Sequence, residues 1–96
     1  MEKRSLQFHL PVIILREKKR FVAYSPALDL STSGKTLATA RKNFAEVAVL
    51  FLEEIIENNT TAEVLEGLGW QKKDSQWESP IIVVNQSETV KIPIAV

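Results

Sequence analysis

A stretch without glycine or proline, from residue 37 to residue 57, constrains the fold of this chain more than any other feature. Its apolar residues return every three or four positions, as on one face of a helix, and they cover an arc of roughly 180–200°. These residues are Leu37, Ala40, Phe44, Ala45, Val47, Ala48, Phe51, Leu52, Ile55 and Ile56. Thr36 precedes the run and can accept a backbone N–H of the first turn. We therefore predict an amphipathic helix over 37–57, with an apolar face wider than packing on one sheet requires.

Three extended segments are expected before this helix. Residues 5–15 alternate, with the even-numbered side chains from Leu6 to Ile14 apolar, although Pro11 restricts this strand to an edge or a bulge. Residues 16–20 form a charged turn that leads into a return strand at 21–24. A third strand is predicted at 27–31, followed by a turn at Ser33-Gly34. This order predicts an α+β fold in which one long helix packs on a small antiparallel sheet of three to four strands.

The chain after the helix predicts smaller elements. A Thr-x-x-Glu pattern starting at Thr60 opens a short second helix that ends before Gly67. A hairpin is expected over residues 70–77, and residues 81–84 are extended. The strand-like segment 88–96 places its apolar side chains on one side; these are Val90, Ile92 and Ile94. We predict a βββα domain over 1–70 and a C-terminal β extension over 71–96, whose last strand adds to a sheet edge of this chain or of another subunit.

The composition excludes several classes of protein. The 96 residues are 45% hydrophobic and 25% charged, as in an ordinary globular domain, and the net charge of zero argues against gripping nucleic acid over a large surface. There is no cysteine and one histidine, so no disulfide framework and no thiolate metal site is expected, and we expect no cofactor. No apolar run has bilayer-spanning length and no signal peptide is recognisable, so we expect a cytoplasmic protein without a membrane partner.

Two charged clusters are candidates for binding. The first lies on the predicted solvent side of the long helix, where acidic residues surround one leucine; its members are Glu46, Leu50, Glu53, Glu54 and Glu57. This surface suits a basic protein partner. The second is the basic turn, which consists of Arg16, Lys18, Lys19 and Arg20. It offers the alternative of a stand-alone oligomeric nucleic-acid-binding or regulatory module. Salt-dependent binding of nucleic acid by the isolated chain would indicate such a module.

A catalytic role is not expected. Asp29 is the one acid that a relict nuclease site could use, but two-metal hydrolysis needs several convergent carboxylates. The single histidine, His9, has no second histidine with which to form an acid–base pair. We therefore predict a binding protein and not an enzyme.

The order of the motifs resembles the HicB family of antitoxins. The resemblance covers roughly residues 8–70: an aromatic-x-Ala motif at 21–23, a Pro-x-Leu motif at 26–28, a Gly-x-Thr turn at 34–36 and the amphipathic helix. It implies a βββα fold related to a degraded ribonuclease H domain, homo-oligomers, and a small basic HicA-type toxin that cleaves mRNA as the partner. Many members add a C-terminal DNA-binding motif. None is recognisable after Trp70, so we do not expect this chain to bind operator DNA.

Overall fold

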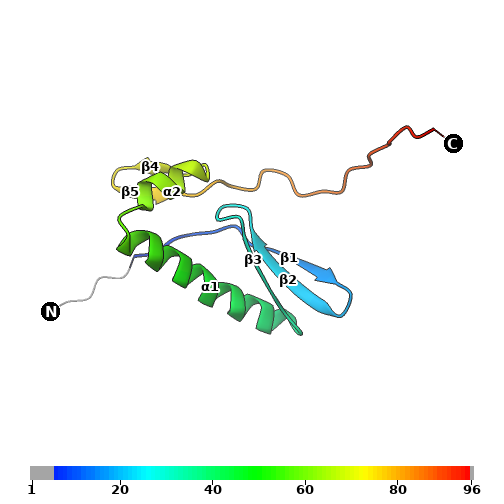
Figure 1. Cartoon of the computed structure of the whole chain (residues 1–96), viewed down its shortest axis with the longest axis horizontal. Coiled ribbons are helices and arrows are strands. Elements are labelled where there is room, and N and C mark those ends of the chain that lie inside the picture. Colours follow the sequence, from blue (N-terminus) through cyan, green and yellow to red (C-terminus); the bar gives the residue numbers. More distant parts are fainter. Residues whose placement is uncertain (1–5, 96) are drawn as a thin grey trace.

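The structure, a computed structural model, describes residues 6–95 and has the predicted α+β architecture (Figure 1). Its elements follow one another along the chain as β1 (Ile13–Glu17), β2 (Arg20–Ser25), β3 (Leu30–Gly34), α1 (Leu37–Glu57), α2 (Thr61–Gly67), β4 (Gln71–Lys73) and β5 (Gln76–Glu78). β1, β2 and β3 form an antiparallel sheet in that order, and β4 and β5 form a separate hairpin. The predicted sheet, long helix and short second helix are confirmed.

The first strand is shorter than predicted. Its ladder with β2 begins at the pair Ile13 and Tyr24, since β2 ends at Ser25. Residues 6–12 therefore run on past the end of the hairpin without forming a strand, and residue 5 lies outside the described part of the chain. The apolar alternation continues through this segment, so the sequence pattern could not reveal where the pairing stops.

The third strand lies three residues later than predicted. Residues 26–29 form the loop of the second hairpin, where Asp29 takes a φ of 50° that favours a turn. Ala27 and Leu28 lie in this loop and are buried. Their apolar character therefore reflects core contacts and not a strand. The predicted turn at Ser33-Gly34 is wrong, because both residues pair with β2.

Gly34 fixes how closely β3 approaches the first turn of α1. A Cβ at this position would lie 2.6 Å from the backbone nitrogen of Ala40 and 2.9 Å from the carbonyl carbon of Thr39. The helix itself begins as predicted, because the Thr36 hydroxyl accepts the Thr39 N–H at 3.1 Å. Glycine is therefore required by the contact between strand and helix rather than by a turn.

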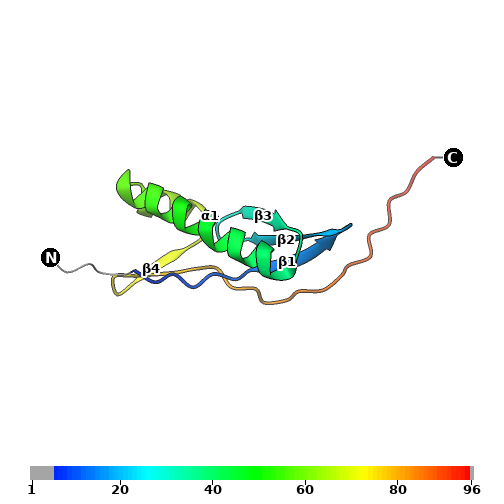
Figure 2. The ribbon, with the colours of Figure 1, turned by 90° about the horizontal axis from the view of Figure 1, so that it is seen from below.

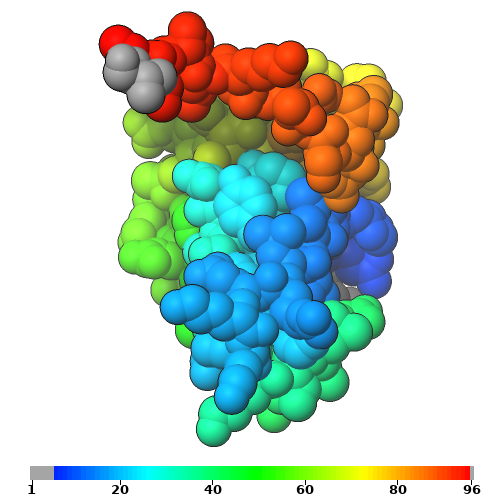
Figure 3. Space-filling view, turned by 90° about the vertical axis from the view of Figure 1, so that its right-hand side faces the viewer, coloured from blue at the N-terminus to red at the C-terminus, as the bar shows by residue number. Residues whose placement is uncertain are grey.

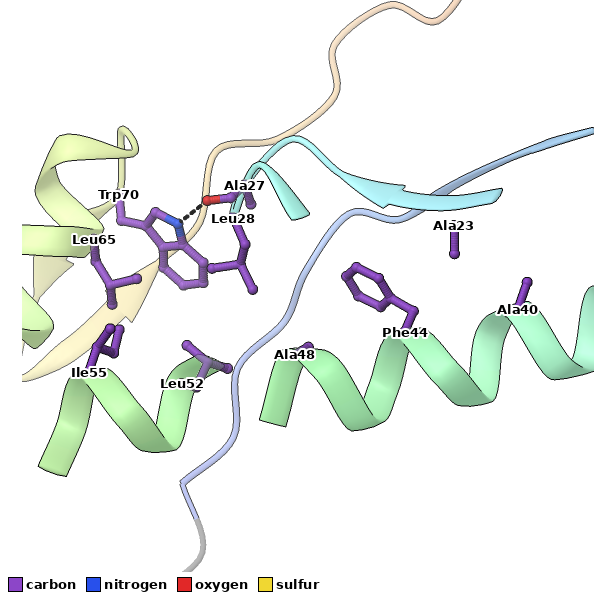
Figure 4. Packing of buried hydrophobic residues seen from close by; sticks show 10 residues of the cluster. All are labelled: Ala23, Ala27, Leu28, Ala40, Phe44, Ala48, Leu52, Ile55, Leu65 and Trp70. Atoms are coloured by element: carbon purple, nitrogen blue, oxygen red, sulfur yellow. Dashed lines mark hydrogen bonds between the residues drawn. The ribbon is translucent and has the colours of Figure 1, made fainter. Parts of the chain in front are cut away.

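The core lies between α1 and the sheet and continues under α2 (Figure 4). Helix α1 buries a stripe at helical spacing, made of Ala40, Phe44, Ala48, Leu52 and Ile55. The predicted apolar arc is wider than this stripe. Ala45 and Ile56 are exposed, because the three-stranded sheet covers only part of the arc.

Trp70 closes the α2 end of the core. Its side chain is buried, and its Nε1–H donates to the carbonyl of Ala27 at 2.7 Å (Figure 4). The ring also meets Phe8 edge-on, with 6.0 Å between the ring centroids. The predicted capping box at the start of α2 does not form. The Thr60 hydroxyl instead donates to the Ile55 carbonyl at the end of α1, which ties the two helices together.

Residues 79–95 carry neither helix nor strand (Figures 1 and 2). The predicted extended run at 81–84 and the predicted strand at 88–96 therefore do not pair with this chain's own sheet within the described residues; Val96 lies outside them. The radius of gyration is 16.9 Å, whereas about 12.5 Å is expected for a compact chain of this length, since the tail leaves the body. No helix among the described residues has the length and apolar character that a bilayer crossing demands.

Candidate interaction surfaces

An acidic stripe runs along the solvent side of α1. Its members recur at helical spacing and are all exposed: Glu46, Leu50, Glu53 and Glu57. At 100° per residue they lie within an arc of about 60°. Leu50 is 65% exposed, so an apolar side chain stands in the open among three carboxylates. Within residues 6–95 the ion pair found is Lys73–Glu78, so none of the three carboxylates is neutralised by a salt bridge there.

The basic cluster lies at the tip of the β1–β2 hairpin but is divided between two faces. Only Lys18 and Lys19 form the turn, whereas Arg16 and Arg20 belong to strands. Arg16 pairs with Phe21, and Arg20 pairs with Glu17. Because neighbouring strand residues point to opposite faces, Arg16 and Arg20 lie on opposite sides of the sheet. Glu17 adds an acid beside Arg20, and the Arg20 guanidinium donates to the Ser33 hydroxyl at 3.2 Å.

Asp29 is engaged by a phenol. The Tyr24 hydroxyl donates to its Oδ1 at 3.0 Å across the β2–β3 loop. This hydrogen bond is the main reason why the pKa of Tyr24 is raised, and burial and the negative charge of Asp29 add to it. Among residues 6–95, no three histidine, cysteine or acidic side chains gather closely enough to hold a metal ion.

A long, largely apolar groove, which we call the α1 groove, lies between α1 and residues 6–14 and borders the acidic stripe, since Glu53 also lines it. One wall is made by the even-numbered side chains from Leu6 to Ile14, and the other by α1 residues that include Phe44, Val49 and Ile56. Its larger part has a volume of about 830 Å³, and a second part of about 510 Å³ shares Leu10 and Phe44 with it. The two parts together follow α1 from Ile56 back to Leu37.

Sequence analysis missed one member of this groove. Val49 is 52% exposed and was not assigned to the apolar arc, although it stands four residues after Ala45 and seven before Ile56. That spacing places all three on one helix flank. The width of the predicted apolar arc was the available signal. The arc is wider than the part of α1 that packs on the sheet, and the helix flank beyond that part forms the wall of the groove.

The predicted partner residues and the predicted tail residues belong to different places in the fold. The acidic stripe is a continuous surface on α1. The tail residues Val90, Ile92 and Ile94 are 76–78% exposed and lie in the segment without regular structure. Figure 3 shows the orange and red tail at one edge of the molecule and the green start of α1 at the opposite edge.

Comparisons with protein-family models, with curated proteins and with solved structures found no match for this chain.

Proposed function

We propose that this chain is a HicB-like antitoxin, a binding protein that neutralises a small basic mRNA-cleaving toxin by covering its RNA-binding site. One observation carries the proposal: three carboxylates without salt bridges in the described chain surround an exposed leucine on the outer side of α1. The βββα order is compatible with it, since the HicB resemblance implies the same order.

The stripe offers the two properties that a complex with a basic protein needs. Its carboxylates attract and orient a positively charged surface, which raises the rate of encounter and selects the partner. Leu50 supplies an apolar contact that can be buried at the centre of the interface, where most binding energy concentrates. Because α1 is fixed on the sheet by its buried stripe, the binding side chains are already arranged before the partner arrives.

Inhibition is steric in this proposal. A toxin that binds RNA must present basic side chains to phosphates. Those same side chains would pair with Glu46, Glu53 and Glu57, so RNA and this chain would compete for one surface. The proposal includes homo-oligomers, which would present several stripes at once, and a cytoplasmic location, where mRNA is found.

The test begins with affinity purification of the tagged chain from the organism that encodes it. We expect a stoichiometric, small, basic companion, identified by mass. The companion alone should cleave RNA, and addition of this chain should suppress the cleavage. A companion that cleaves RNA equally well in the presence of this chain would contradict the proposal.

Direct nucleic-acid binding is the second candidate. The specific observation is the set of four exposed cations at the β1–β2 tip. The isolated chain should then bind RNA or DNA at low salt, with affinity that falls as salt rises. Arg16 and Arg20 lie on opposite faces of the sheet, so the four cations do not form one basic surface. We therefore rank this candidate below the antitoxin proposal.

A further inference from the structure

We propose that the α1 groove receives the C-terminal segment of a second copy of this chain, residues 90–95, and that two copies exchange these segments. The proposal does not depend on the antitoxin function. It starts from two features of the described residues: a largely apolar groove along α1 and a tail whose large apolar side chains are 76–78% exposed.

The acceptor side has a strand edge that carries no paired strand, although one of its backbone groups, the His9 carbonyl, accepts a hydrogen bond from the Ser79 hydroxyl. Residues 6–12 continue β1 without a strand opposite them. In the described chain, the backbone hydrogen bonds outside the regular elements all lie between Thr36 and Trp70, so none of them engages this segment. Its side chains Leu6, Phe8 and Leu10 already face the groove. A strand added here would extend the sheet and cover the groove at the same time.

The donor side has the matching pattern. Val90, Ile92 and Ile94 alternate with Lys91, Pro93 and Ala95, so an extended segment presents its three large apolar side chains to one side. In an extended strand the backbone N–H and C=O groups of residues 90, 92 and 94 point to one side. In the proposed docking this side faces the acceptor. Pro93 lacks an N–H but falls in the other set, whose groups face solvent in an edge strand. Proline is therefore compatible with this docking register.

The course of the tail favours a neighbouring molecule over the chain's own groove. The tail begins beside the acceptor segment, because the Ser79 hydroxyl donates to the His9 carbonyl at 2.8 Å. It then runs away from α1 and beyond the sheet (Figures 1 and 2). Residues 80–89 can span up to about 33 Å when extended. Each copy owns one groove and one tail, so reciprocal exchange closes into a two-fold dimer without leaving a free end.

The first measurement is the molar mass of the full chain in solution by light scattering. We expect twice the 10.8 kDa of one chain. Two variants, Ile92→Asp in the tail and Val49→Asp in the groove, should each halve that mass, because each places a charge in the buried interface. Matched controls place the same charge next to each site but outside the proposed contact, Lys91→Asp and Leu50→Asp, and should remain dimeric. Circular dichroism verifies that every variant is folded.

The second measurement places the tail in the partner's groove. The chain has no cysteine, so Val49→Cys in a tagged chain and Ile92→Cys in an untagged chain give one thiol each. After the two are mixed and oxidised, we expect a disulfide-linked tagged–untagged pair. A chain that carries both substitutions distinguishes its own tail from the tail of a second copy, because a tail in its own groove gives a cross-linked monomer.

Three results would overturn the proposal: a wild-type chain with the mass of a monomer, a dimer that persists when residues 88–96 are deleted, or cross-linking only within one chain. These results are independent of the antitoxin function. If Val49→Asp is a monomer that still suppresses the companion's RNA cleavage, the groove serves dimerisation and is not needed for inhibition. Leu50→Asp should show the reverse, a dimer that inhibits poorly.

Discussion

Tyr24 and Asp29 are joined by a hydrogen bond across the β2–β3 loop, and the chain contains no other tyrosine. The bond requires the protonated phenol, and the phenolate would face the Asp29 carboxylate. Both effects raise the pKa of Tyr24 above its ordinary value of about 10. The stability that this bond contributes is therefore present below pH 10 and is lost as the pH rises through the pKa of the folded chain.

An alkaline titration tests this pair directly. Phenolate absorbance in the near ultraviolet reports Tyr24 alone among the tyrosines, since there is only one. We expect a midpoint above pH 10 in the wild-type chain and a midpoint closer to 10 in Asp29→Gly, which removes the acceptor oxygen and the charge and tolerates the φ of 50° at this position. Equal midpoints in the two proteins would show that Asp29 does not hold the phenol.

At the residue scale, the sequence predicted one of two helix caps correctly, and it did not predict contacts between residues far apart in the chain. Thr36 was identified as the N-cap because its role depends on adjacent residues alone. Thr60 fits the same local rule, but its hydroxyl is taken by the Ile55 carbonyl of the preceding helix. The partner of Trp70 could not be predicted, because Ala27 lies 43 residues earlier in the chain.

At the scale of elements, the contact between β3 and α1 depends on Gly34. Gly34→Ala would drive a methyl group into the backbone of Thr39 and Ala40, which cannot move away as a side chain can. We expect a loss of about 1–3 kcal/mol in the free energy of unfolding. For a domain of this size, each kcal/mol lowers the melting temperature by about 4–8 °C.

The control is the same substitution at Gly67, where an added Cβ meets nothing within 4 Å. Gly67 lies at the end of α2, so alanine there should leave the melting temperature unchanged or raise it slightly. If Gly34→Ala and Gly67→Ala melt alike, the close packing of β3 against α1 is not present in solution.

The boundaries of α1 were predicted correctly, whereas those of β1 and β3 were not, and this difference has a physical cause. α1 is defined by a period within 21 residues and by a cap next to it. The limits of β1 and β3 are set by where β2 ends and by the loop at residues 26–29, which are properties of the pairing. A local apolar pattern continues across those limits and cannot mark them.

At the scale of the whole molecule, α1 carries two adjoining surfaces. The acidic stripe lies around Leu50 and the groove around Val49, and Glu53 belongs to the stripe and also lines the groove. The sequence predicted the stripe from polarity alone. It predicted the tail as a strand but not the groove as its acceptor, because the groove exists only once residues 6–14 lie alongside the helix.

RNA cleavage by the co-purified basic companion, measured as this chain is added in increasing amounts, tests the antitoxin function most directly. We expect complete suppression by the wild-type chain at equimolar ratio. The variant with Glu46→Lys, Glu53→Lys and Glu57→Lys should need an about tenfold or higher concentration, since each reversal weakens attraction to a basic surface. Lys18→Glu with Lys19→Glu, a charge reversal at the hairpin tip, should inhibit as the wild type does. Suppression that survives in the α1 variant and is lost in the hairpin variant would contradict this function for the acidic stripe.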